Sequence, residues 1–391
     1  MRPTKDKRAG GSKYGTIRYP EDVKHMARRD FSMERYLATR CATMRPLYEF
    51  TATDPAEAKD WRIKAVAKLR DLLGEMPDSC QLDAETVESV DMGSYIREKV
   101  IFDADSHSSV PGYLLIPKGL EGPAPTLLCP HGHGPGKDPV AGVTTADERY
   151  SEEQKRASLE QHNYDYAVQF AKRGYVTFTF DFRCFGERAE VPFSLYGRDI
   201  CNVQFIRASL LGLNLLSLDI HDSYRALEYL CERPEVDADR IGCVGLSFGG
   251  TMTLWTAALD KRIKAAAISG YLCEFESFAV RQGNFCGSQY LPALRRYFDM
   301  SDVASLIAPR PLLIESGRFD EGFPIDSANL AYDRLRCAYE AWGKPEMLAH
   351  DVFDGGHVFH GAEAYAWFDK WLRDAPQPTN DRCRKHPPAH M

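Results

Sequence analysis

The amino-acid sequence predicts an α/β fold, in which a mostly parallel sheet is covered by helices on both faces. The main observation is an alternation, from residue 125 to residue 372, of short apolar runs with segments of helical periodicity. A second observation is that polar or glycine-rich stretches follow several of these runs, as expected for loops at the carboxyl ends of parallel strands. The chain has 391 residues, 44% of them apolar, so it is long enough to bury a large core.

The chain divides into one large domain with extensions at both ends. Residues 1–14 are basic and glycine-rich, and we expect a disordered tail there; residues 376–391 are expected to form a C-terminal tail. Residues 15–90 are expected to form a helical extension. Apolar residues recur in it at three- and four-residue spacing, at Trp61, Ala65, Leu69 and Leu72. The large domain is expected to cover 91–375, with an aromatic-rich insertion at 272–302 that lies over the site formed by the loops after the strands.

Within the domain, an antiparallel hairpin is expected first, because apolar and polar residues alternate on either side of a polar turn, over 95–102 and 112–117. Buried strands are expected at 126–129, 175–181, 241–246, 263–269, 312–314 and 348–353. Helices are expected at 164–173, 218–230, up to about 260, 328–342 and 362–372. Strands that alternate with helices run parallel, so the loops after them meet at one edge of the sheet.

A serine nucleophile is predicted at Ser247. This residue is the centre of a Gly-x-Ser-x-Gly motif that follows an apolar run and precedes a stretch readable as a helix. The motif forms a nucleophile elbow in that strand, turn and helix context. Gly245 and Gly249 suit the sharp turn, because a residue without a side chain lets backbone pass close to backbone. The other interpretation is an ordinary tight turn with a solvated serine.

An acid and a base are predicted downstream. A serine hydroxyl is a weak nucleophile and needs an imidazole base, which in turn needs a carboxylate to fix its tautomer. His357 follows the last predicted strand after two glycines, and Asp320 lies in the loop after the strand before it. Glu315 is the main competitor of Asp320, with Glu321 and Asp326 also nearby.

An oxyanion hole is predicted from two backbone N–H groups. Acyl transfer builds negative charge on the former carbonyl oxygen, which needs one donor after the nucleophile and one from the loop after an earlier strand. Phe248 supplies the first donor. For the second we choose His133, because it lies between two glycines in the run His131-Gly132-His133-Gly134.

Five motifs together resemble the α/β-hydrolase superfamily, and within it the branch of dienelactone hydrolase-like proteins and acetyl xylan esterases or cephalosporin deacetylases. They are His-Gly-His-Gly at 131–134, Asp-Phe-Arg-x-Phe-Gly-Glu-Arg at 181–188, Gly-x-Ser-x-Gly at 245–249, Gly-Arg-Phe-Asp-x-x-Phe-Pro at 317–324 and Gly-Gly-His at 355–357. The similarity spans about 94–372 and implies a serine esterase that hydrolyses small acyl esters. The sequence departs from dienelactone hydrolases in carrying Ser247 in place of cysteine, and from acetyl xylan esterases in carrying His133 in place of tyrosine.

Substrate contacts are assigned to His131, Phe285 and Tyr290. The two aromatic residues belong to the 272–302 insertion, where rings with polar neighbours suit a wall that stacks on a ring-shaped alcohol. The alternative for the insertion is that its aromatic residues pack it onto the body, and for the histidine side chains it is loop packing.

The composition limits the classes of binding partner and the cellular location that we expect. The net charge is −7, which gives no basic field for nucleic acid or anionic lipid, so we expect a small-molecule ester as the partner. The chain contains no apolar run of about 18 residues and no apolar stretch behind its charged N-terminus, so no membrane or secretory segment is expected. The chain has 11 cysteines scattered along it, a pattern that indicates reduced thiols in a cytoplasmic protein. The sequence implies no cofactor or metal and leaves open whether the chain forms a homo-oligomer.

Three other functions stay open at this stage. A serine peptidase or amidase would use the same triad. A metal-dependent hydrolase would use His131 with His133, or His357 with His360. A fluorophosphonate would not label a non-catalytic binding protein, because such probes require an activated serine. The charged loop at 181–188 is expected to be braced by ion pairs.

Overall fold

A nine-stranded sheet forms the centre of the structure, a computed structural model that describes residues 30–144, 151–189, 194–195, 198–283 and 286–374. The strand order is β1-β2-β3-β5-β4-β8-β9-β10-β11. Pairs from β1 to β5 along this order are antiparallel, and all pairs from β5 to β11 are parallel. The predicted α/β fold with a mostly parallel sheet is therefore confirmed. The two expected tails lie outside the described residues.

The strands agree closely with the apolar runs of the sequence. Their bounds are β1 Glu85–Asp91, β2 Tyr95–Asp105, β3 Ser108–Pro117, β4 Ala124–Leu128, β5 Val176–Phe180, β8 Val236–Leu246, β9 Ile263–Ser269, β10 Leu312–Gly317 and β11 Leu348–Phe353. The predicted hairpin is β2 and β3. β1 was not predicted and lies inside the stretch that we expected to be helical. A short separate pair is formed by β6 Ser194–Leu195 and β7 Arg198–Asp199.

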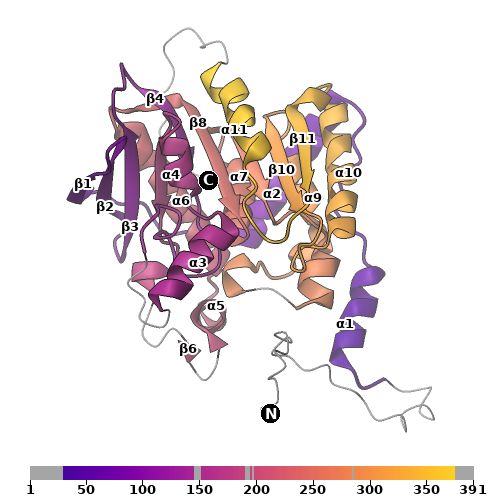
Figure 1. Cartoon of the computed structure of the whole chain (residues 1–391). Helices are drawn as coiled ribbons and strands as arrows, with labels where there is room; N and C mark the ends of the chain where they lie inside the picture. Colours follow the sequence, from indigo (N-terminus) through magenta and orange to yellow (C-terminus); the bar gives the residue numbers. More distant parts are fainter. Residues whose placement is uncertain (1–29, 145–150, 190–193, 196–197, 284–285, 375–391) are drawn as a thin grey trace, which may run out of the picture.

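Helices cover both faces of the sheet (Figure 1). Their bounds are α1 Met33–Ala42, α2 Pro55–Leu73, α3 Glu152–His162, α4 Tyr166–Ala171, α5 Ile200–Leu210, α6 Leu215–Glu232, α7 Phe248–Leu259, α8 Leu294–Tyr297, α9 Met300–Ser305, α10 Ile325–Ala341 and α11 Ala362–Phe368. Of the helices in these ranges, none alone is long and apolar enough to span a bilayer; only α5 and α6, bent by 101°, meet that test when taken together.

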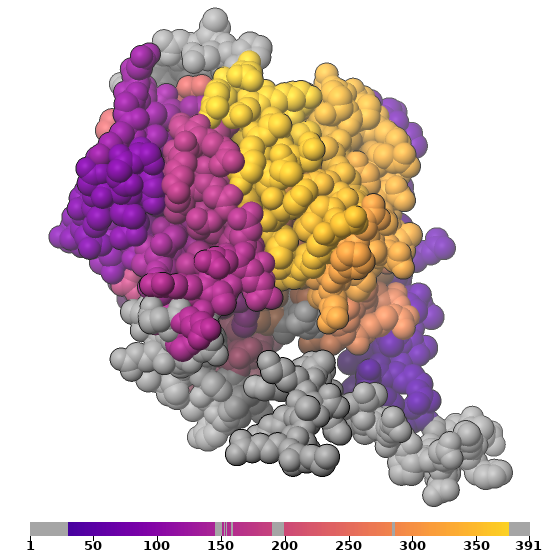
Figure 2. Space-filling view, in the orientation of Figure 1, coloured from indigo at the N-terminus to yellow at the C-terminus, as the bar shows by residue number. Residues whose placement is uncertain are grey.

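Two hydrophobic cores lie on opposite faces, because successive side chains of a strand point in opposite directions. Along β8, Cys243 contributes to the larger core, with α2, α6, α7 and α9, whereas Val244 contributes to the smaller one, with α4 and α11. Figure 2 shows this second layer as adjoining magenta and yellow segments. The two layers hold the strand ends, and hence the loops of the site, in fixed positions.

Helix α2, from the N-terminal part of the chain, packs into the larger core. Asp54 caps its first turn by accepting from the N–H groups of Ala56 and Glu57, and Pro55 is its first residue. The buried side chains Ala65 and Leu69 face the core, as the spacing predicted. At its C-terminal end, the Ser217 hydroxyl of α6 donates to the carbonyl of Leu73. By contrast, α1 lies away from the sheet (Figure 1).

Candidate active site

Ser247 occupies a strained turn between β8 and α7. Its backbone has φ 65° and ψ −121°, a region that residues with side chains rarely adopt, and its N–H donates to the Ser269 carbonyl at 2.9 Å. A methyl group at Gly245 would overlap the backbone of Gly249, and one at Gly249 would overlap the Pro130 carbonyl. The sequence therefore folds here as the expected elbow, because only glycine fits on either side of the serine.

His357 and Asp320 meet across the loops that follow β11 and β10. The imidazole Nδ1 lies 2.7 Å from Asp320 Oδ2. The other carboxylate oxygen, Oδ1, accepts from the N–H groups of Gly322 at 2.9 Å and Phe323 at 3.1 Å, and the Asp320 side chain is buried. These bonds fix the carboxylate, which in turn orients the ring. The other ring nitrogen, Nε2, lies on the opposite side of the imidazole from Asp320.

The imidazole is also brought to the corner of the sheet that carries Ser247. A Cβ atom on Gly270 would lie 3.2 Å from both Nδ1 and Cε1 of His357. Gly270 directly follows Ser269, which accepts the N–H of Ser247. The ring of His357 and the elbow therefore adjoin the same two residues at the end of β9, a position compatible with a base beside a nucleophile.

Glu315, the competing acid, faces a different part of the molecule. Its side chain is fully enclosed, and Oε1 accepts from the Gly361 N–H at 2.9 Å. Burial raises the pKa of Glu315 to about 7. The carboxylate that accepts from His357 Nδ1 is that of Asp320, not that of Glu315. This geometry agrees with the sequence ranking that placed Asp320 first.

The loop that carries His133 adjoins the elbow because its strand, β4, pairs with β8 in parallel register, with Leu128 opposite Cys243. A Cβ atom on Gly132 would lie 3.2 Å from the Leu246 carbonyl and would overlap the hydroxyl of Tyr164. The backbone of this loop therefore packs closely against the backbone at the end of β8. It places the chain just before His133 against the residue that precedes Ser247.

His131 was expected to contact substrate, and the structure corrects this. Its ring is fully buried, Nδ1 lies 2.7 Å from the Gly132 carbonyl and Nε2 accepts from the Phe182 N–H at 3.1 Å. Burial lowers the pKa of His131 to about 4, so the ring is neutral near pH 7, as an acceptor must be. The side chain links two strand-end loops and has no surface left for a ligand.

The insertion at 272–302 divides into a buried part and an exposed part. Phe275, Phe278 and Phe298 are buried in the larger core, so for them the packing interpretation is correct. Tyr290 is 43% exposed, and its ring centroid lies 5.5 Å from that of Phe205 in α5. Tyr290 therefore keeps the accessibility that substrate contact requires. Phe285 lies outside the described residues.

The insertion also touches both the elbow helix and the triad loop. Gln289 donates to the Thr251 hydroxyl in α7 at 2.7 Å. The ring of Phe278 stacks on that of Phe323, with centroids 4.5 Å apart. These contacts tie 272–302 to elements that hold Ser247 and Asp320.

The charged loop at 181–188 is braced by ion pairs, as predicted. Asp181 accepts from the ammonium group of Lys137 at 2.7 Å, and Arg183 binds the fully buried Asp222 at 2.8 Å. Arg188 donates to the same Asp222 carboxylate at 2.7 Å. Because Lys137 lies in the loop that carries His133, this network fixes that loop from its far end.

In the part of the chain that the structure describes, neither proposed histidine pair belongs to a group of three or more potential metal ligands. His360 Nδ1 lies 2.6 Å from Asp351, away from the His357 partner Asp320. Two groups of side chains in the described part of the chain could jointly ligate an ion, namely Glu315 with Asp351 and His360, and His133 with Cys201 and Cys286. The second group was not foreseen, because its members are far apart in sequence and share no spacing motif.

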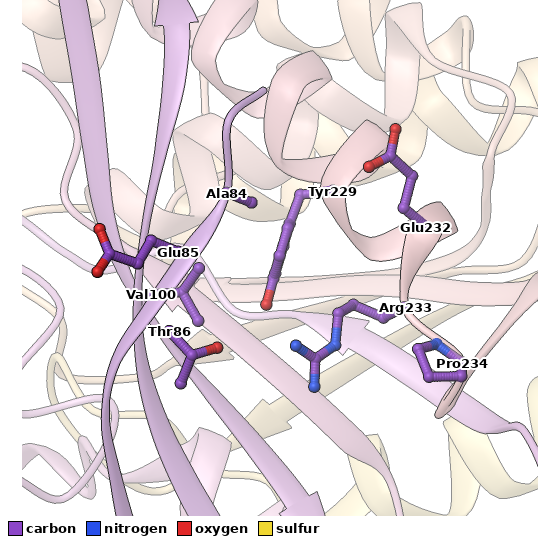
Figure 3. Close-up of a pocket in the computed structure, with 8 residues that line it drawn as sticks. All are labelled: Ala84, Glu85, Thr86, Val100, Tyr229, Glu232, Arg233 and Pro234. Atoms are coloured by element: carbon purple, nitrogen blue, oxygen red, sulfur yellow. The ribbon is translucent and has the colours of Figure 1, made fainter. Parts of the chain in front are cut away.

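A hollow of about 400 Å³ lies between β1, β2 and the C-terminal end of α6 (Figure 3). It is lined by Ala84, Glu85, Thr86, Val100, Tyr229, Glu232, Arg233 and Pro234. Pro234 precedes the start of β8, whereas Ser247 follows its end, so the hollow and the nucleophile elbow lie at opposite ends of this strand. Arg233 is already paired with Glu98 at 3.0 Å. We therefore assign this hollow no part in the chemistry.

Comparison with known proteins places these features in context. The sequence profile of the Abhydrolase family matches residues 20–353. The protein named putative hydrolase YtaP, from Bacillus subtilis strain 168, is 30% identical over 319 residues, which cover 77% of this chain and 96% of that protein. A crystal structure of a putative acetyl xylan esterase from Bacteroides fragilis superposes with a TM-score of 0.70 at 20% identity, covering 83% of each chain. A glucuronoyl esterase from Solibacter usitatus superposes with a TM-score of 0.61 at 18% identity, covering 85% of this chain and 99% of that one.

Proposed function

Because this chain belongs to the Abhydrolase family of α/β-hydrolases, we propose that it is a serine carboxylesterase that acts on small acyl esters. The observation that carries the proposal is the hydrogen bond of 2.7 Å between His357 and the buried Asp320, beside a serine held at φ 65° in a nucleophile elbow. Proteins with a similar fold include acetyl xylan esterases and glucuronoyl esterases, so ester hydrolysis is among the activities that this fold supports.

In the proposed acylation step, the Ser247 hydroxyl attacks the ester carbonyl while its proton passes to Nε2 of His357. The Nδ1–H of the same ring donates to Asp320, which stabilises the imidazolium that forms. When the tetrahedral intermediate collapses, the imidazolium gives its proton to the departing alcohol and the acyl group stays on Ser247. Water then attacks the carbonyl of the acyl-enzyme while His357 again takes the proton. The carboxylic acid is released and the Ser247 hydroxyl is restored.

The oxyanion in both tetrahedral intermediates is assigned to the backbone N–H groups of Phe248 and His133. Phe248 is the first residue of α7, where the positive end of the helix dipole adds to the N–H. Close packing of the Gly132 region against Leu246 supports the placement of the second donor. Donors held by packed backbone require no reorganisation during the reaction, which is the basis of their catalytic effect.

The proposed substrate is a small-molecule ester with a short acyl chain and a ring-shaped alcohol. Tyr290 supports this assignment, because among the aromatic residues of the insertion that the structure describes it is the exposed one and is thus able to stack on a ring. The cytoplasmic location belongs to the same proposal, and the free thiols of the described cysteines support it.

The test is labelling with a fluorophosphonate followed by an ester and amide panel. The wild-type chain should be labelled at Ser247, whereas Ser247→Ala should not be labelled although it remains folded. Turnover of acetyl esters with little turnover of matched amides would support an esterase. Preferential cleavage of amides would replace the esterase with the peptidase or amidase of the same triad, and an unlabelled wild type would refute the serine mechanism.

A further inference from the structure

Three side chains that are distant in sequence gather beside the proposed oxyanion loop. They are His133 after β4, Cys201 in the first turn of α5 and Cys286 just before the helical turn Gly287–Gln289. The Nε2 atom of His133 lies 3.5 Å from Sγ of Cys201, and the three donor atoms all lie within 4.8 Å of one another. Both cysteines are buried, whereas the His133 side chain is 33% exposed. The group is therefore closed on its sulfur side and open on its imidazole side.

The spacing fits a tetrahedral thiolate and imidazole metal site. Zinc binds cysteine sulfur at about 2.3 Å and histidine nitrogen at about 2.0–2.1 Å, so tetrahedral angles place these donors roughly 3.5–3.8 Å apart. The observed separation of 3.5 Å between nitrogen and sulfur falls in that range. Two thiolates with one imidazole also favour zinc over the hard cations magnesium and calcium, which take oxygen ligands.

A fourth donor is close by. The Oδ2 atom of Asp199 lies 4.0 Å from Nε2 of His133, and Asp199 precedes Cys201 by two residues at the start of α5. Its side chain is 49% exposed and can rotate toward the open side of the group. A carboxylate at this place would complete four-coordination and would offset part of the charge of the metal.

The two cysteines are held together by backbone contacts. A Cβ atom on Gly287 would overlap the Cys201 carbonyl and the side chain of Phe205, so the turn and α5 touch directly. The N–H of Gly287 donates to the Asn202 side chain at 2.7 Å. Contacts on either side of Cys201 and Cys286 thus pre-organise the pair without any ion.

We propose that His133, Cys201 and Cys286 bind a zinc ion, with Asp199 as fourth ligand, and that this ion fixes the loop of His133 to α5 and to the insertion. Both cysteines bind as thiolates, the ligand form of cysteine, and any proton that a sulfur carries before binding is released to solvent. The ion is structural and takes no part in acyl transfer. Its presence does not depend on the proposed esterase activity, and it is detected without any substrate.

The other candidate ligand group is already satisfied internally. The His360 ring bonds to Asp351 at 2.6 Å, and Glu315 accepts from the backbone of Gly361. An ion there would have to displace these bonds, whereas at His133 it would replace only weak contacts of sulfur. The geometry therefore points to the cysteine-containing group.

The test uses the full chain, reduced and freed of metal with a chelator, and Co²⁺ as a spectroscopic probe. One equivalent should bind and should give the thiolate-to-cobalt charge-transfer absorption together with the visible bands of tetrahedral Co²⁺, and added Zn²⁺ should abolish both. Cys201→Ser and Cys286→Ser should each weaken Co²⁺ binding by more than about 100-fold. This loss exceeds the one usual for a residue that only hydrogen-bonds to a metal ligand. Cys337→Ser, at an exposed cysteine, is the matched control and should bind as the wild type does.

A measurement on the unmodified chain keeps the test decisive if a serine variant does not fold. Zinc-edge X-ray absorption of the loaded wild type should show two sulfur ligands at about 2.3 Å. Coordination by nitrogen and oxygen alone, or no stoichiometric binding by the reduced chain, would overturn the proposal. Equal binding by folded Cys201→Ser would overturn it too. If the reduced chain binds no metal but forms a Cys201–Cys286 disulfide in air, the pair is a redox site instead.

Discussion

The ring of Phe323 stacks on the ring of His357, with centroids 5.5 Å apart and planes inclined by 16°. The same residue donates its backbone N–H to Asp320 Oδ1. One residue therefore contacts the proposed acid through its main chain and the proposed base through its side chain. The ring of Phe323 also stacks on that of Phe278 from the 272–302 insertion. This aromatic stack connects the insertion to His357.

Phe323→Ala should lower kcat by roughly 10- to 100-fold with a smaller change in KM, because a displaced imidazole loses its alignment with the nucleophile. Steady-state kinetics on an acetyl ester measures the effect. Tyr332→Ala removes a ring that stacks on His350, outside the triad, and is the matched control for loss of a histidine stack. Equal losses of kcat in the two variants would show that the effect is one of general packing.

Ser247→Ala and His357→Ala should each reduce kcat by about 10⁴-fold or more, and the double variant should resemble either single one, because the triad acts as a unit. The circular dichroism spectrum and the melting temperature provide the folding control. Additive losses in the double variant would mean that the two residues act independently. Full activity of Ser247→Ala would eliminate the nucleophile assignment.

Asp320→Asn should depress kcat by about 10⁴-fold, since the amide no longer holds the correct imidazole tautomer. Glu315→Gln should change kcat by less than about tenfold, because Glu315 bonds to the Gly361 backbone and not to His357. The comparison of the two variants on one substrate is the measurement. If Glu315→Gln were the more damaging change, the acid would have to be reassigned to Glu315.

Glu315 should make stability depend on pH in a defined direction. Its pKa is raised by burial from 4.5 to about 7, so between these values the folded chain binds more protons than the unfolded chain. The contribution of Glu315 to the free energy of unfolding is therefore fully present below about pH 4.5 and is lost as the pH rises through about 7. The loss amounts to roughly 3 kcal/mol, at about 1.36 kcal/mol per pKa unit. Relative to Glu315→Gln, the wild type should lose unfolding free energy between pH 5 and pH 8, as measured by urea titration. A constant difference would contradict the raised pKa.

The acyl preference follows from the proposed compact pocket. In a series of p-nitrophenyl esters, kcat/KM should be highest from acetyl to butyryl and should fall for chains of about eight carbons or more, because excess methylenes overlap a closed pocket. Tyr290→Ala should change the preference among alcohols more than that among acyl chains. A maximum at octanoate or beyond would place the activity with long-chain lipases.

The candidate site could be predicted from sequence where its signals are local. Ser247 is recognised by its two glycines and its flanking strand and helix, and those glycines have the close contacts that the motif requires. The parallel order of the strands then placed Asp320 and His357 at the same edge. These inferences need only chain order and periodicity, which a single sequence contains.

Other features depend on contacts that no local pattern encodes. β1 was missed because its residues are almost all exposed and lack an apolar alternation. The packing of His131 depends on the N–H of Phe182, which comes from the loop after the neighbouring strand β5. Cys201 and Cys286 meet through the packing of α5 against the insertion, whereas the sequence predicts only that the cysteines are reduced.

The position of β11 affects when the enzyme becomes reactive. This strand is at the edge of the sheet, pairs with β10, and is followed by the loop of His357. During synthesis the elbow strand β8 emerges before it, and a domain generally folds as a unit. A nascent chain that lacks β11 and the loop after it therefore contains Ser247 but not His357. Under the proposed mechanism, a chain cleaved before β11 would keep the nucleophile and be inert, because the proposed base is missing.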